Sequence, residues 1–209
     1  MDFDERRKAL ENAFFHKRDL ELLAQLGERE AKAQRRNQLA QATGIQDQTL
    51  LDCLDDLKIR PETLEALLLV PLVEIAWADG KMHTRQRQAV LAAAKQAELH
   101  LNYDAYRLLE SWLDAKPDRR LVVAWKQYVC FLSRRMSPQE MQTLRDDTMD
   151  RALFVAEATG GILGFHRVGR EERAKLDELS SLLNEVAAAF TCPESKADSA
   201  GSTPSELTK

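Results

Sequence analysis

The sequence contains few of the residues that build disulfide-bonded, zinc-binding or strand-rich proteins. Its 209 residues include three Cys, eight Gly and six Pro, and aromatic residues make up 6% of the chain. So little Gly and Pro argues against many short strands joined by tight turns. The three Cys are widely spaced with no CxxC pair, and no His lies at metal-ligand spacing from another His or a Cys, so neither a disulfide framework nor a zinc motif is expected. The cysteines are Cys53, Cys130 and Cys192, and the histidines are His16, His83, His100 and His166. We expect Cys53 and Cys130 to be core residues.

A long apolar run and an excess of one charge sign are also missing. The most apolar stretch, Ala66 to Ala78, is interrupted by Glu74 and is shorter than the roughly 20 residues that span a bilayer. The first residues, MDFDERRKAL, lack the apolar segment of a signal peptide. We therefore expect no transmembrane segment and a cytoplasmic protein. The net charge of -4, with both signs interspersed, argues against nucleic acid as a partner.

Charged and apolar residues, at 31% and 44% of the chain, favour helices. The predicted fold class is all-α, a multi-helix bundle of about eight or nine helices. Apolar periodicity predicts the better-defined helices at residues 84–98, 103–115, 119–135, 138–158 and 171–190. The predicted organisation is a helical N-terminal portion at 1–60, a helical domain at 61–190 and a disordered, polar tail at 191–209.

Several residues predict where helices begin, end or bend. The tetrad Ser137-Pro-Gln-Glu140 combines an N-cap Ser, a Pro in the first turn and a Glu three residues after the cap. Gly44 is placed to end the N-terminal helix, and Gly27 is a candidate point for dividing that helix in two. Pro71 falls inside a predicted helix, where a kink or a restart is expected.

We expect the fold to be organised around residues 64–99, read as two helices joined by a turn at Asp79-Gly80. A weaker copy of this helix-turn-helix pattern follows near residues 158–172, which suggests two helical hairpins packed on each other. Aligning the two Gly turns places the residues of the first copy opposite those of the second: Ala78-Asp79-Gly80 opposite Ala158-Thr159-Gly160, Met82 opposite Val168, and Gln86 opposite Glu172.

The run EIAWADGKMHTRQR, from Glu74 to Arg87, resembles the Ala-Asp-Gly motif of the TerB-like tellurite-resistance superfamily. In that family a short apolar helix ends in Ala-Asp-Gly, and a Glu usually follows about six or seven residues later. The resemblance covers about residues 64–185. The chain departs from the family pattern at Gln86, where an acidic residue is usual, and at Thr159, where the second copy lacks the Asp.

The resemblance implies an all-helical, acidic domain that works in bacterial stress-response or membrane-associated complexes, with carboxylates that bind cations. The family's molecular activity is poorly defined. A structural interpretation of the same residues, which we favour, needs no ligand. In it Gly80 takes a left-handed turn, Asp79 accepts backbone hydrogen bonds, and Gln86 forms a capping box with His83.

Glu74 is the starting point of the functional interpretation, because it lies between Val73 and Ile75 in the apolar stretch. A carboxylate in such surroundings must be protonated, be paired with an Arg or Lys, or bind a cation. Pairing with an Arg is the favoured outcome. The alternative is a site for a hard cation such as Ca²⁺ or Mg²⁺, although EF-hand spacing is absent. Its candidate ligands are Glu74, Asp79, Glu157 and Glu172, with Asp150 as a further possibility.

Two segments outside the motif are candidate interaction surfaces. The loop Gly160 to Arg167 is rich in Gly but lacks the Lys and hydroxyl of a P-loop. Its apolar residues either pack beneath the second hairpin, which is favoured, or dock a partner or a membrane surface. The stretch Glu28 to Arg36 is almost wholly polar and is either an exposed arm or a helix with a narrow docked stripe.

These patterns favour a non-enzymatic, cytoplasmic TerB-like interaction or stress-response module, with a possible response to cations. Its protein partner is unidentified, and peripheral membrane association stays open. One alternative is a metal-dependent enzyme with a carboxylate cluster inside the bundle, although the Glu-x-x-His pairs of di-metal bundles are absent. Another is a structural scaffold that recruits a partner through Glu28 to Arg36. No spacing nominates a catalytic nucleophile.

Overall fold

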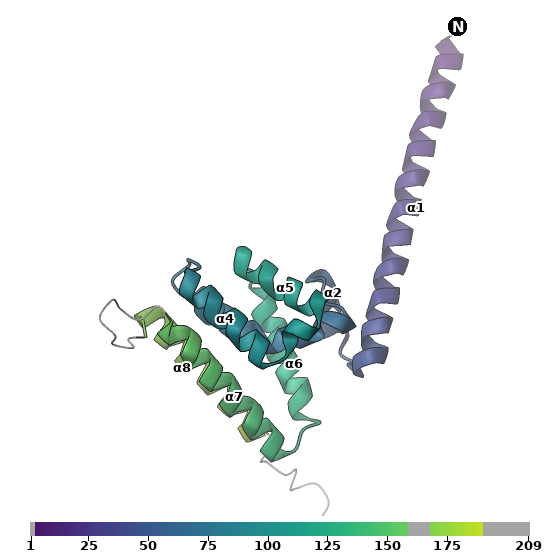
Figure 1. The fold of residues 1–209 in the computed structure, drawn as a ribbon. Coiled ribbons are helices and arrows are strands. Elements are labelled where there is room, and N and C mark those ends of the chain that lie inside the picture. Colours follow the sequence, from purple (N-terminus) through teal and green to yellow (C-terminus); the bar gives the residue numbers. More distant parts are fainter. Residues whose placement is uncertain (1–2, 159–167, 190–209) are drawn as a thin grey trace, which may run out of the picture.

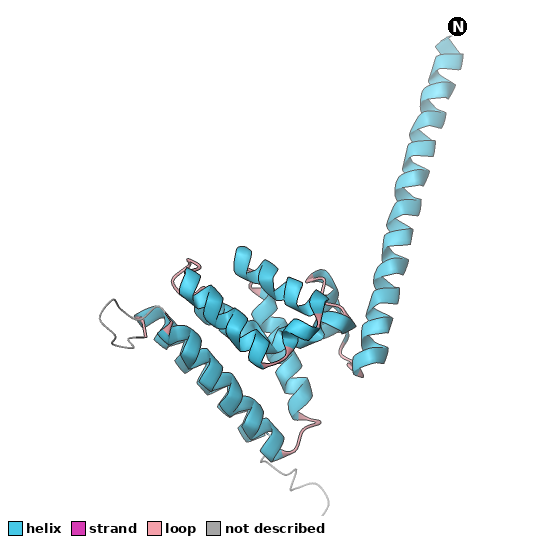
Figure 2. Cartoon of the chain, in the orientation of Figure 1, coloured by secondary structure: helices cyan, strands magenta, loops and turns pink. Residues whose placement is uncertain are grey.

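The computed structural model describes residues 3–158 and 168–189, with side chains from residue 14 to residue 188. This part of the chain is all-helical and contains no strand (Figures 1 and 2). The segments 159–167 and 190–209, and with them the loop Gly160 to Arg167 and the predicted tail, lie outside the described residues. The helices are α1 (Phe3–Thr43), α2 (Gln48–Asp56), η1 (Pro61–Leu69), α3 (Val70–Ala76), α4 (Thr84–Gln96), η2 (Leu99–Leu101), α5 (Tyr103–Asp114), α6 (Arg120–Ser133), α7 (Pro138–Glu157) and α8 (Arg170–Ala189).

The all-α class is confirmed, and the five helices with predicted bounds lie within two residues of them. Local signals account for this agreement. Ser137 accepts a hydrogen bond from the Glu140 backbone while the Glu140 carboxylate accepts one from the Ser137 backbone, which is the predicted capping box. Gly44, with φ +73°, ends α1 as expected. The division at Gly27 is wrong, because α1 runs unbroken through it; a single Gly costs a helix only about 1 kcal/mol.

The change from η1 to α3 confirms the restart expected at Pro71. Residues 61–69 form a 3-10 helix, and the α-helix begins at Val70. Pro71 therefore sits in the first turn of α3, where its missing N–H has no partner to lose.

Helix α3 is the centre of the body of the molecule. It packs against α4, α6, α7 and α8, and every one of its residues except Glu74 is buried. Helices α7 and α8 form a hairpin that packs on α3, so the two predicted hairpins do lie against each other (Figure 1). One buried core runs from Leu39 to Val186 and includes residues on both sides of the predicted domain boundary at residues 60 and 61. The division into two domains at that boundary stays a prediction.

Helix α1 has two different halves. Its C-terminal half packs on α2 through Leu39 and a set of ion pairs, whereas the rest projects away from the body (Figure 1). Arg35 donates to the buried carboxylate of Asp55 at 2.8 Å, which lowers the pKa of Asp55. Lys32 and Arg36 pair with other Asp residues of α2. The second half of the stretch Glu28 to Arg36 is thus a narrow docked stripe whose basic residues pair with α2, and recruitment of a partner through this stretch stays a prediction.

Candidate functional site

The Ala-Asp-Gly turn is held by local contacts of Asp79. Gly80 has φ +82°, in the left-handed region that glycine favours. One carboxylate oxygen of Asp79 accepts from the Lys81 backbone at 2.9 Å, and the other lies 2.9 Å from Nε2 of His83. The contact with His83, and then the backbone bond, lower the pKa of Asp79. These contacts follow the structural interpretation, in which Asp79 stabilises the turn.

Gln86 does not form the expected capping box, because His83 makes no side-chain cap hydrogen bond. Instead the Gln86 side chain turns into the core, where its Nε2 donates to Oε1 of Glu172 at 3.3 Å. Gln86 is 1% exposed and Glu172 is 5% exposed. The two residues occupy corresponding places in the first turns of α4 and α8. The positions that the sequence repeat aligned therefore touch each other inside the molecule.

Two further features of the contact between Gln86 and Glu172 concern its oxygen atoms. The Oε1 atom of Gln86 is buried and has no hydrogen-bond partner among the described residues. A Cβ built at Gly169 would overlap the Glu172 carboxylate, so the absence of a side chain there leaves room for that group to lie over the start of α8. The first turn of a helix favours negative charge, because its backbone N–H groups are unpaired. The result is a buried carboxylate beside an amide oxygen to which no residue in the described part of the chain donates.

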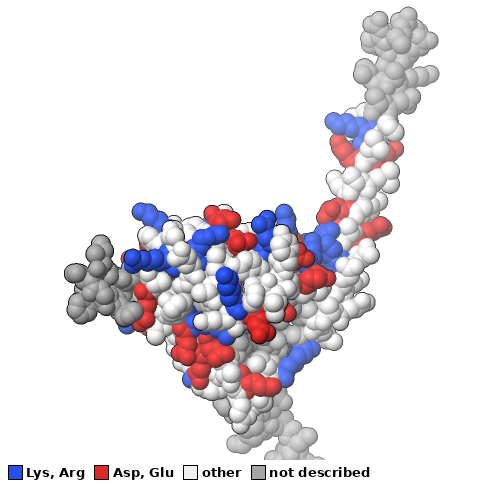
Figure 3. Space-filling model, in the orientation of Figure 1, with Lys and Arg blue, Asp and Glu red and all other residues white. Residues whose placement is uncertain are grey.

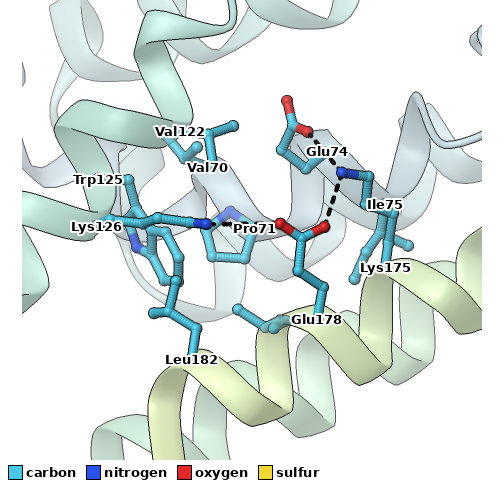
Figure 4. Close-up of a pocket in the computed structure, with 11 residues that line it drawn as sticks. Val70, Pro71, Glu74, Ile75, Val122, Trp125, Lys126, Lys175, Glu178 and Leu182 are labelled. Carbon is cyan, nitrogen blue, oxygen red and sulfur yellow. Dashed lines mark hydrogen bonds and ion pairs between the residues drawn. The ribbon is translucent and has the colours of Figure 1, made fainter. Parts of the chain in front are cut away.

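Glu74 lies at the rim of a small, half-open pocket between α3, α6 and α8 (Figure 4). Its carboxylate is 3.8 Å from Nζ of Lys175, which also donates to Glu178 at 3.1 Å. Glu178 in turn lies 3.5 Å from Lys126 of α6. The ammonium of Lys175 is the main cause of a lowered pKa at Glu178. Apolar side chains line the rest of the pocket: Val70, Pro71, Ile75, Val122, Trp125, Leu179 and Leu182.

The pocket therefore carries two carboxylates and two ammonium groups in an alternating row. Their charges cancel, and each carboxylate already has a cationic neighbour. The expected pairing of Glu74 is thus observed, although the partner is Lys175 and not the Arg that was favoured. The row joins three helices across the surface of the core, which suits a role in holding α8 against α3 and α6.

The four candidate cation ligands do not meet in one place. Glu74 faces Lys175, Asp79 faces His83, and Glu172 faces Gln86. Glu157 is half-buried at the end of α7 and has an interaction of its own. Among the described residues, no group of three or more His, Cys, Asp or Glu side chains is placed to hold a metal ion. The further candidate Asp150 is exposed on α7. A Ca²⁺ or Mg²⁺ site at these carboxylates stays a prediction.

The projecting half of α1 is the feature that the sequence interpretation missed. Residues 14–30 are all exposed, and six of them are large and apolar. Their helical spacing is visible in the sequence, but spacing alone does not show whether another element covers them. Figure 3 shows charges of both signs interspersed along this arm and over the body. The six residues are Phe14, Phe15, Leu20, Leu22, Leu23 and Leu26.

The two described cysteines differ in their surroundings. Cys53 is half-buried at the α2 surface facing α6, and burial raises the pKa of its thiol. Cys130 is exposed, so the expectation that it is a core residue is wrong. It lies on the outer side of α6, whose inner side is filled by Trp125 and Val129.

Comparison of the chain with family models, curated proteins and solved structures found no match. The TerB-like relationship therefore stays a prediction based on residues 74–87 and the internal repeat. No helix in the described residues is both long enough and apolar enough to cross a membrane.

Proposed function

We propose that the protein is a non-enzymatic, cytoplasmic interaction module of the TerB-like kind, which binds a helical protein surface through the projecting part of α1. The observation that carries the proposal is the set of six large apolar side chains on that arm, which are 48% to 64% exposed. Burying one such side chain typically stabilises a complex by about 1.5 to 3 kcal/mol. Large exposed apolar groups gathered on one element are typical of binding surfaces.

The charged residues of the pocket at Glu74 support this proposal, because they are already paired with one another. In the pocket at Glu74, a ligand has to displace Lys175 or Lys126 from their carboxylates. A partner of α1 has to displace water alone from the apolar residues of the arm. The TerB-like resemblance adds a role in a stress-response complex. The alternative enzyme with a carboxylate cluster stays a prediction, without a placed set of ligands among the described residues.

A second candidate function, response to a divalent cation, is favoured by the contact of Gln86 with Glu172. Hard cations prefer oxygen ligands, and this contact offers a carboxylate beside an amide oxygen that accepts no hydrogen bond within residues 3–158 and 168–189. An ion present at about 100 times its Kd stabilises the fold by roughly 2.7 kcal/mol. Thermal melts with Ca²⁺, Mg²⁺ or EDTA test this idea. A melting temperature unchanged by either ion would exclude it.

Capture of binding proteins by variants of α1 tests the main proposal. The tagged native chain is compared with Leu26→Glu, which puts a carboxylate among the apolar residues of the arm. The matched control is Ala24→Glu, which adds the same charge on the opposite side of the same exposed helix. We expect proteins cross-linked to α1 to be recovered with the native chain and Ala24→Glu and to be depleted with Leu26→Glu. Equal recovery with all three chains would contradict the proposal.

A further inference from the structure

One side of the α1 arm carries an apolar stripe that the body does not cover. Phe15, Leu22 and Leu26 follow one another at steps of seven and four residues and are 59%, 48% and 52% exposed. At about 100° per residue, they are turned by roughly 100° to 140° from Leu39, the residue by which α1 enters the core. The stripe therefore faces away from the surface on which α1 rests.

The stripe belongs to a longer pattern with alternating steps of four and three residues. Such steps mark the contact positions of two helices that pack along each other. Residues 15–33 supply six of these positions over about 28 Å of helix. In order along the chain, they are Phe15, Asp19, Leu22, Leu26, Arg29 and Ala33.

We propose that the helical partner of α1 is α1 of a second copy, paired antiparallel over residues 15–33 about a two-fold axis that crosses the pair at the level of residue 24, on the side of α1 opposite the Ala24 side chain. This inference rests on the proposed function and names its partner. In this register Leu22 faces Leu26 of the second copy, and the two-fold axis repeats the contact. Alternating steps of four and three residues define two kinds of contact position, a and d. Antiparallel helices pack a against d, and in this register every facing pair combines one a position with one d position.

Charge and size both match in this register. Asp19 faces Arg29 of the second copy, so that opposite charges meet twice. The large ring of Phe15 faces the small Ala33 at each end, and the leucines meet in the middle. A parallel pair would instead place Asp19 beside Asp19 and Arg29 beside Arg29. Like charges at such positions are unfavourable, so the pattern selects the antiparallel arrangement.

The exposed state of the arm gives a physical reason for pairing. Residues 14–30 make few contacts with the body, and most helical stability in proteins comes from packing an apolar face. Pairing covers Phe15, Leu22 and Leu26 on both chains. Leu23, which is 64% exposed, lies beside the stripe and adds apolar surface near the two-fold axis.

Sedimentation velocity of the full chain tests the proposal over roughly 1 µM to 1 mM, which spans moderate to weak affinities. We expect the native chain and Ala24→Glu to approach twice the monomer mass of 23.8 kDa as the concentration rises. The double variant Leu22→Glu/Leu26→Glu is expected to stay monomeric. Its unfolding curve should still show a folded body, because both positions are exposed on the arm. A monomeric native chain at all concentrations would overturn the proposal.

Charge exchange tests the direction and the register. Asp19→Arg and Arg29→Asp each place like charges together in the antiparallel pair, and each is expected to weaken dimerisation at least tenfold. The double variant Asp19→Arg/Arg29→Asp restores opposite charges and should recover most of the native affinity. If the double variant dimerises no more tightly than the single variants, this register is refuted. The pair would then be parallel, or α1 would bind another surface of the chain.

The outcomes also separate this inference from the proposed function. If the native chain is monomeric but Leu26→Glu still loses its cross-linked proteins, self-pairing falls and the interaction module stands. If self-pairing and capture are both unaffected by Leu26→Glu, the arm is not the binding surface and both fall. If the charge exchange rescues dimerisation, the second copy is established as the partner of the arm.

Discussion

Replacing Gln86 by Glu tests the buried contact between the two repeats. The substitution changes an amide donor into a second carboxylate, facing Glu172 at the position where the native Nε2–Oε1 distance is 3.3 Å. Both residues are buried in the native chain, with exposed fractions of 1% and 5%. Two adjacent buried carboxylates cannot both stay charged at low cost.

The expected loss of folding stability follows from two energies, the repulsion between two charged carboxylates and the cost of protonating one of them. Two unit charges 3.3 Å apart repel by roughly 5 kcal/mol at an effective dielectric constant of about 20. Protonating one carboxylate avoids this repulsion, and for a group with an ordinary pKa of about 4.3 it costs roughly 3.7 kcal/mol at pH 7. The cheaper route is protonation, so Gln86→Glu should be less stable than the native chain by about 3 to 4 kcal/mol at pH 7. At pH 5 the same cost falls to roughly 1 kcal/mol.

Urea unfolding at pH 7 and pH 5 measures this difference. The folded variant holds one more proton than the unfolded chain, so its stability relative to the native chain rises as pH falls. The exchanged variant Gln86→Glu/Glu172→Gln keeps one carboxylate and one amide and should regain most of the stability. A loss at pH 7 below about 1 kcal/mol, or one that does not depend on pH, would refute the reasoning. A loss reversed by Ca²⁺ would identify the pair as a cation site.

Three further predictions concern other parts of the molecule. Asp55→Asn should lower the stability by about 2 kcal/mol in urea unfolding at pH 7, whereas Asp56→Asn, at an exposed position, should cost less than about 1 kcal/mol. Because the folded-state pKa of Asp55 is lowered, its contribution should disappear as pH falls through that value. Gly44→Ala should cost about 1 to 2 kcal/mol in the same assay, because φ there is +73°. In a chain with Cys192→Ser, a thiol reagent should modify Cys130 well before Cys53, because burial raises the pKa of Cys53.

Local signals in the sequence predicted most of the fold. The Ser137-Pro-Gln-Glu140 tetrad and Gly44 act through hydrogen bonds and backbone angles within a few residues, so their effects are visible without the rest of the chain. Pro71 likewise marks where α3 begins. Gly27 was misjudged, because a glycine stops a helix only where a turn or a left-handed residue follows. Residues around Gly27 continue α1 on both sides.

The contacts at the candidate sites depend on distant residues and were harder to predict. The apolar neighbours of Glu74 left protonation, pairing with Arg or Lys, and cation binding open, with an Arg favoured, and the choice of Lys175 depends on how α8 crosses α3. The sequence predicted only a local capping box for Gln86, and the repeat alignment placed it opposite Glu172 without showing that the two touch. A capping box can be expected from neighbouring residues alone, whereas the contact with Glu172 depends on how α4 and α8 lie in the fold.

The arm of α1 was missed for a related reason, since periodicity shows that a helix has an apolar face but not what covers it. At the pocket of Glu74 and at Asp55 the carboxylates are already paired with Lys and Arg side chains. A ligand there has to break existing pairs before it gains any contact. On the arm, a partner removes water from apolar residues that have no other cover among the described residues. Because apolar burial is the main source of association free energy, binding is expected at α1 and not at the pocket of Glu74.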